Sequence, residues 1–225
     1  MLQVPKSNPS LADQAHRKLE ELIVTLELPP GSTYSEFALS DLVGIGRTPV
    51  REAVKRLEAG RLLETVPRHG VRVSRIDLYE QLQVIELRAD LERLISSWAA
   101  IRAMPAERKQ LLEMATEFEE AAKRDDIHAY LRAVFVANQY IAQCARNPFA
   151  SAAIAPLFGL SRRFYYVYHE ELANLSEVSR LHSERGRAVA MGDAAIAEQA
   201  AVELMKRIED FTRKIFMREA GRSSP

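Results

Sequence analysis

The chain of 225 residues contains 47% apolar and 28% charged residues, and its 31 basic side chains are balanced by 31 acidic ones. This composition is typical of a globular protein and excludes the intrinsically disordered and fibrous classes. The length favours two domains of about 100–150 residues each. A net charge of zero does not indicate a nucleic-acid partner, so only the distribution of charge along the chain can indicate one.

Location is predicted from features that the sequence lacks. No apolar run approaches the roughly 18 residues that cross a bilayer, and the first ten residues lack the basic-then-apolar order of a signal peptide. We therefore expect a cytoplasmic protein with no membrane partner. The one cysteine, Cys144, cannot form an internal disulfide or a cysteine-rich zinc site. We expect it to pack in a helix core.

The first part of the chain predicts two helices. Apolar residues spaced by three and four positions mark a helix from Leu11 to Leu26, closed by a turn at 29–31 with two prolines and a glycine. Ser35 is expected to cap a second, short helix. The glycines Gly44 and Gly46 are expected to end it.

A third helix and a β-hairpin are expected next. Thr48 and Pro49 open the helix, because threonine can accept from free backbone amides and proline favours the first helical position. Two short strands, 62–66 and 71–74, enclose a tip at 67–70, where a glycine can adopt a positive φ angle. Three helices followed by a hairpin predict a winged helix-turn-helix.

Basic residues are concentrated in this third helix and hairpin. Residues 46–75 hold eight basic side chains and three acidic ones, an excess that a phosphate backbone attracts, although charge alone also fits a solvated face without a partner. Arg47 and Arg51 can present guanidinium groups to guanine in the major groove, and Lys55 can meet a phosphate. The predicted DNA contacts are Arg47, Thr48, Arg51, Lys55, Arg68, His69 and Gly70.

From Asp77 onward the apolar pattern is helical throughout. Six helices with short turns are expected, which favours an antiparallel bundle and a mainly α protein. The expected helices begin near Asp77, Glu107, Asp125, Asn147, Glu177 and Asp193. We therefore predict a DNA-binding domain at 8–76 and an all-helical domain at 77–219.

Several motifs resemble one family of bacterial regulators. The string Gly46–Leu57 is similar to the recognition-helix signature of the GntR family, and 29–32 and 68–71 also look like that family. The C-terminal region resembles the effector domain of the FadR subfamily, called the FCD domain. That likeness depends on Leu87–Glu92, on Ala145–Phe149 and on a histidine eleven residues before Asp193.

The resemblance implies a homodimer that binds a short inverted-repeat operator. Arg47, Thr48, Arg51, His69 and Gly70 occupy the family's DNA-contact positions. The sequence departs from some members in the second helix. Where they carry an arginine that contacts DNA, this chain has Phe37, so its operator preference cannot be transferred from theirs.

Many domains of this subfamily hold a divalent metal with one aspartate and three histidines. The corresponding positions here are Val134, Asn138, His182 and a site near Leu204. Valine and leucine cannot ligate a cation, and one imidazole with one neutral amide gives a poor site. We therefore predict a pocket without a metal or other cofactor.

A pocket without a metal needs other groups to hold an anionic or polar effector. The candidates are Arg88, Asn138, His182 and Arg163, because arginine can pair with a carboxylate. Each has an alternative role: such an arginine is often a salt-bridge partner, and a lone histidine is often structural. Tyr165 or Tyr166 could act together with Arg163, although a tyrosine cluster at 165, 166 and 168 is more typical of core or dimer packing.

These observations favour a sequence-specific transcription regulator, a repressor or an activator, controlled by a small carboxylate-bearing metabolite. An enzyme is the competing class, but the sequence has no nucleophile beside a histidine, no paired acids and no phosphate-binding glycine loop. We therefore expect no enzymatic activity. A DNA-binding regulator without an effector is a third possibility, and it predicts a packed bundle without a cavity.

Overall fold

The computed structural model describes residues 9–171 and 175–222, and the chain divides into two compact units, one up to Ile76 and one from Asp77. Helices make up most of both described ranges, so the prediction of a mainly α protein is confirmed. Within those ranges, no helix is both long enough and apolar enough to cross a membrane.

The N-terminal unit contains the three predicted helices. Ser10 begins the first with a reciprocal capping box to Asp13, and the Ser35 hydroxyl accepts from the backbone N–H of Ala38 to begin the second. Gly44 ends the second helix in the left-handed conformation, with φ of 67°. The helices are α1 (Leu11–Val24), α2 (Glu36–Val43) and α3 (Arg47–Ala59).

The start of α3 differs from the prediction. Gly46 is the capping residue and makes no side-chain cap, so Thr48 and Pro49 lie inside the first turn and do not open the helix. The predicted start at Thr48 was wrong because a glycine can also precede the first helical residue, without a capping side chain. The consequence is that Arg47 is the first helical residue.

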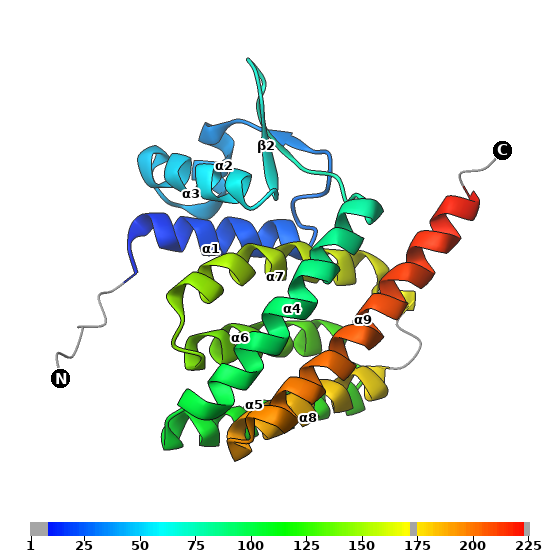
Figure 1. Cartoon of the computed structure of the whole chain (residues 1–225). Coiled ribbons are helices and arrows are strands. Elements are labelled where there is room, and N and C mark those ends of the chain that lie inside the picture. The colour runs from blue at the N-terminus through cyan, green and yellow to red at the C-terminus, as the bar shows by residue number, and fades with distance from the viewer. Residues whose placement is uncertain (1–8, 172–174, 223–225) are drawn as a thin grey trace. The chain divides into compact units, whose positions relative to one another are not determined.

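A three-stranded antiparallel sheet completes the unit. The predicted hairpin consists of β2 (Leu63–Val66) and β3 (Gly70–Val73), and it projects beyond the three helices (Figure 1). A strand that was not predicted, β1 (Thr33–Tyr34), pairs with β3, giving the order β1-β3-β2. Two residues carry too little pattern for a sequence to reveal a strand.

Six α-helices and one short 3-10 segment make up the described part of the C-terminal unit. Asp77, Asp126 and Asn147 act as capping residues, as the sequence suggested. The α-helices are α4 (Leu78–Arg102), α5 (Pro105–Lys123), α6 (Ile127–Cys144), α7 (Pro148–Tyr168), α8 (Leu175–Met191) and α9 (Ala194–Arg222), and the 3-10 segment is His169–Glu171.

The bundle is organised around two long neighbouring helices, α4 and α9, which lie side by side along most of their lengths (Figure 1). Helix α5 packs on α8, and α6 contacts α4, α5 and α7. A large apolar cluster includes Ile95, Ile141, Phe158 and Val189. Cys144 is fully buried in it, which confirms the prediction that it packs in the core.

Candidate functional site

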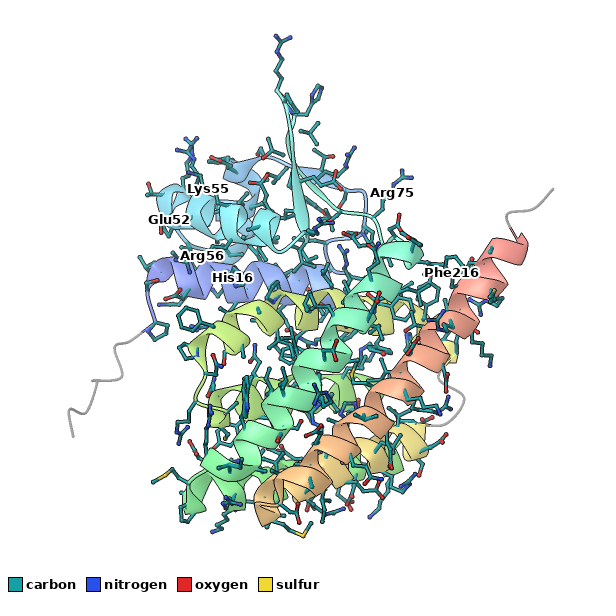
Figure 2. The ribbon with its side chains drawn as sticks, viewed as in Figure 1. His16, Glu52, Lys55, Arg56, Arg75 and Phe216 are labelled. Atoms are coloured by element: carbon teal, nitrogen blue, oxygen red, sulfur yellow. The ribbon has the colours of Figure 1, made fainter. Side chains whose placement is uncertain are left out.

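The exposed face of α3 carries the predicted DNA-contacting side chains. Arg47, Thr48, Arg51 and Lys55 are all exposed to solvent. Figure 2 shows Lys55 on the side of α3 away from α1, whereas Arg56 lies on the side toward α1. The Arg56 guanidinium is bound to the Asp13 carboxylate there, at 2.6 Å between Nη1 and Oδ1. The basic residues of α3 are thus divided between one open face and one structural contact.

One arginine on the open face already has an acidic partner. Arg51 donates to the carboxylate of Glu36 through Nε and Nη2, with the shortest distance 2.8 Å from Nη2 to Oε2. This hydrogen bond from Arg51 lowers the pKa of the Glu36 carboxyl, so the carboxylate is charged near neutral pH. Because 53% of the Arg51 side chain and 30% of the Glu36 side chain are exposed, another anion can compete with Glu36 for Arg51.

The tip of the hairpin depends on its backbone. Arg68 has φ of 66° and Gly70 has φ of 98°. Glycine at position 70 avoids the strain that a side chain would cause at such a φ angle. A Cβ on Gly70 would also overlap the carbonyl oxygen of Tyr34 in β1. Arg68 and His69 are exposed, and they stand at a tip whose shape is fixed by this close contact between strands.

A cavity of about 50 Å³ lies inside the helical bundle. Helices α4, α6, α7, α8 and α9 all contribute to its walls. Most of the wall is hydrocarbon or aromatic, with a few polar groups among it, which is the usual make-up of a small-molecule site. The lining residues are Arg88, Tyr130, Leu131, Val134, Phe135, Asn138, Phe158, Ser161, Arg162, Tyr165, Val178, His182 and Ile208.

The sequence-predicted residues Arg88, Asn138 and His182 come together at this cavity. Arg163 is buried but is not among the lining residues; its neighbour Arg162 is. Tyr165, which the sequence suggested either as a partner of Arg163 or as packing, lines the cavity and also stacks on Phe211, with ring centroids 5.8 Å apart.

A buried ionic network stands behind one wall. Glu92 accepts from Arg88, at 2.7 Å between Nη2 and Oε1, and from Arg185, at 2.5 Å between Nη1 and Oε2. A second nitrogen of Arg185 donates to Oδ1 of Asn138 at 2.8 Å. All four side chains are buried. Two guanidinium groups thus share one carboxylate, and the Arg88–Glu92–Arg185 network has a net positive charge.

The charges in the network shift the pKa values of its neighbours. Burial alone would raise the pKa of the Glu92 carboxyl, but the guanidiniums of Arg185 and Arg88 outweigh burial and lower it. Burial, followed by the same two guanidiniums, lowers the pKa of His182 well below 6.5. His182 is therefore a neutral imidazole at neutral pH, held between the ring edges of Phe118 and Tyr130.

Several polar atoms at the cavity have no hydrogen-bond partner within the described chain. They include Nε of Arg88, the hydroxyl of Tyr130 and the hydroxyl of Ser161. The Arg88 guanidinium lies over the ring of Phe158, 5.2 Å from its centroid. Buried polar groups are normally satisfied, so these unpartnered atoms make the cavity a candidate binding site.

Two central residues of the network, Glu92 and Arg185, were missed as site residues by sequence reasoning. The spacing of Glu92 four positions after Arg88 on a helical pattern was an available signal, because such residues share one helix face. Arg185 gave no comparable signal, since its partners Glu92 and Asn138 lie 93 and 47 residues away.

The positions that correspond to the family's metal ligands are partly brought together. Val134, Asn138 and His182 line the cavity, whereas Leu204 is fully buried in an apolar cluster with Ile85. Across the described residues, no group of three or more histidine, cysteine, aspartate or glutamate side chains is arranged to hold a metal ion.

A helix-turn-helix followed by a β-hairpin wing is a DNA-binding motif, and it places the N-terminal unit among DNA-binding proteins. Family comparison gives the same result. The description "Bacterial regulatory proteins, gntR family" matches residues 11–73, and the description "FCD domain" matches residues 83–207. The chain belongs to the GntR family and carries an FCD domain, so it is a DNA-binding transcription regulator. The resemblance seen in the sequence is confirmed.

Relatives and solved structures agree with this assignment. The chain is 23% identical to the HTH-type transcriptional repressor RspR of Escherichia coli, over 90% of this chain and 89% of that one. It is 37% identical to a regulator from an unstable DNA locus of Streptomyces ambofaciens, but over only 40% of this chain and 36% of that one. The structure of E. coli McbR/YncC shares the fold, with a TM-score of 0.80, 20% identity and coverage of 92% and 99%.

Proposed function

We propose that this regulator is a homodimer that binds a short inverted-repeat operator and that a small carboxylate-bearing metabolite controls its affinity. The metabolite would bind in the cavity of the helical unit. The observation that carries this proposal is the Arg88 guanidinium, which lines a mostly apolar cavity with its Nε unpartnered. A carboxylate forms strong, charge-assisted hydrogen bonds with such a group.

The cavity supports a regulator controlled by an effector over a regulator without one. A purely structural bundle gains nothing from buried polar atoms that lack partners, because each costs about 1–3 kcal/mol of desolvation. Here the Tyr130 and Ser161 hydroxyls and Arg88 Nε lack partners at one place. A ligand with a polar group would satisfy them and shift the populations of two bundle conformations.

The proposed DNA contacts are on α3 and the hairpin tip. Arg47, Thr48 and Arg51 would read base edges at the amino end of α3, while Lys55 would contact phosphate. Arg68, His69 and Gly70 would approach the DNA at the hairpin tip. The side chains of Arg47, Thr48, Arg51, Lys55, Arg68 and His69 are all exposed, as this role requires.

The test is binding of the purified protein to genomic DNA fragments across a range of salt concentrations. Wild type should select a site with inverted-repeat symmetry, and the double variant Arg47→Ala with Arg51→Ala should lose at least tenfold of that selectivity. Removing Arg180 and Arg213, two exposed arginines of the helical unit, controls for the loss of two charges. Wild type without sequence preference at any salt concentration would overturn the proposal.

A further inference from the structure

The residues at the family's metal positions do not suit a divalent cation in this chain. Asn138 Oδ1, the amide oxygen that a cation would need, accepts from Arg185 at 2.8 Å. Val134 contributes only hydrocarbon, and Leu204 lies in an apolar cluster. His182 is a single imidazole near two guanidiniums, Arg88 and Arg185, whose positive charge opposes a second cation.

The same side chains do suit an anion. Arg185 is 1% exposed and Glu92 is fully buried, so their charges act with little screening by solvent. Glu92 is shared between Arg185 and Arg88, and it therefore neutralises only one of the two positive charges. Arg88 faces the cavity, which places the remaining positive charge where a ligand can reach it.

We propose that the guanidiniums of Arg88 and Arg185, held on Glu92, replace the divalent metal as the anion-binding group of this FCD domain. We further infer that they select a compact monocarboxylate with an apolar body. This inference rests on the proposed function, because it specifies the ligand of the same cavity. In the proposed site, Arg88 contacts the ligand. Arg185 is a positioning residue: it binds Glu92 and so prevents this carboxylate from neutralising Arg88 completely.

The size and lining of the cavity restrict the ligand further. A volume of about 50 Å³ is small for a ligand site, which favours a ligand with few non-hydrogen atoms. Leu131, Val134, Phe158 and Ile208 supply hydrocarbon walls. A second carboxylate on the ligand would be desolvated against these walls at high cost.

The other cavity-lining guanidinium is engaged with neighbours of its own. Arg162 lies over the ring of Phe135, 4.8 Å from its centroid, and donates to the Tyr166 hydroxyl at 3.4 Å. Its aromatic partners hold the charge in place by cation–π contact. Arg88 makes such a contact too, with Phe158, and we assign the ligand's carboxylate to Arg88 because its Nε has no hydrogen-bond partner.

The experiment is titration calorimetry on the full-length protein after dialysis against EDTA, with acetate, propionate, isobutyrate and malonate as probes. Propionate and isobutyrate should bind with the same Kd in EDTA as in added zinc, nickel or manganese. Malonate, which carries two carboxylates, should bind at least tenfold more weakly. These comparisons use only the wild-type protein, so they stand even if a variant fails to fold.

Variants then locate the binding group. Arg88→Gln should weaken propionate binding by about 10- to 100-fold, since a hydrogen bond to a charged group is lost. Arg93→Gln is the matched control on the same helix, because Arg93 is 37% exposed and paired with Glu198, and it should bind as wild type does. Arg185→Met should also weaken binding, although Arg185 does not line the cavity, and Arg185→Lys should recover part of it.

Three results would overturn the inference. Binding that disappears in EDTA and returns with a metal would show that a cation holds the ligand, while leaving control by an effector intact. Malonate binding as tightly as propionate would contradict the monocarboxylate class. Failure of all four acids to bind would exclude the ligand class, and selection of an operator, measured separately, would then show whether the DNA-binding part of the proposed function survives.

Discussion

The two units use the same pair of residue types, arginine and glutamate, in opposite environments. In the N-terminal unit, Arg51 meets Glu36 at the surface, with 53% and 30% of the two side chains exposed. In the C-terminal unit, Arg185 meets Glu92 with 1% of each exposed. An exposed pair can exchange partners cheaply, whereas a buried pair loses both its Coulomb energy and its hydrogen bonds when one partner is removed.

This difference fits the role proposed for each unit. A surface that reads DNA must release its own ion pairs when phosphates and base edges arrive, so exposure at Arg51 is useful. A ligand cavity must keep its charges fixed before the ligand binds, so burial of Arg88 and Arg185 is useful. The comparison predicts that mutations of similar chemistry will have very different effects in the two units.

The largest effect is expected from Glu92→Gln. This change removes the carboxylate shared by Arg88 and Arg185 and leaves two buried guanidiniums without a counter-charge. The free energy of unfolding should fall by about 3–5 kcal/mol, as measured by urea denaturation. The control is Glu198→Gln, which removes the exposed partner of Arg93 and should change stability very little. Equal effects of the two variants would show that the buried network is not structurally important.

A smaller effect is expected at the backbone of the DNA-binding unit. Gly70→Ala places a Cβ against the Tyr34 carbonyl at a φ of 98°, and we expect a loss of about 1–3 kcal/mol in the free energy of unfolding. Gly44 also has a positive φ, 67°, but this value lies in the left-handed helical region and nothing lies near an added Cβ, so Gly44→Ala should lose less. If thermal unfolding ranked the two variants in the opposite order, the close contact between β1 and β3 would not be the cause.

The pH dependence of stability should come from the buried histidine. The pKa of folded His182 is lowered well below 6.5, so the unfolded chain takes up a proton near pH 6.5 that the folded chain does not. Stability should therefore fall as the pH drops below 6.5, by up to about 1.4 kcal/mol per pH unit for one proton. His16, whose pKa is also lowered, mainly by burial, should contribute in the same direction.

Urea denaturation between pH 5 and 7.5 would measure this slope. In the variant His182→Gln, the free energy of unfolding should depend less on pH than in wild type. In the double variant His182→Gln with His16→Gln, it should depend on pH still less. An unchanged slope in the double variant would assign the pH dependence to other groups.

Local signals in the sequence predicted most of the fold. Helix ends at Ser35, Gly44, Asp77 and Asn147 follow from capping chemistry within four residues. The strand β1 was missed because it exists only through pairing with β3, about 38 residues away in sequence. Contacts over such separations leave no pattern in a single sequence.

In the candidate site, too, some residues could be predicted from the sequence, whereas the contacts between distant segments could not. Arg88, Asn138 and His182 were predicted from the family resemblance and do line one cavity. The link among them is Arg185, which joins Glu92 on α4 to Asn138 on α6. This role depends on the packing of three helices, and neither the composition nor the spacing of the sequence contains it.

The smallest effect on stability is expected from Glu36→Gln. This variant tests the surface ion pair between Arg51 and Glu36. Because the Glu36–Arg51 pair is exposed, its loss should leave urea denaturation nearly unchanged. DNA binding should respond instead, since the change removes a negative charge beside α3 and frees the Arg51 guanidinium. We expect tighter binding to fragments of random sequence at low salt, with the gain disappearing at high salt as screening increases.

Asp41→Asn serves as the control for Glu36→Gln, because it removes an exposed negative charge from the same helix, α2. If both variants tighten binding equally, the gain is a general effect of charge. If only Glu36→Gln does so, Glu36 restrains Arg51 in the free protein, and part of the selectivity for the operator comes from the cost of breaking that pair. The exposed ion pair would then be as functional as the buried one, but as a contact that the protein gives up when it binds DNA.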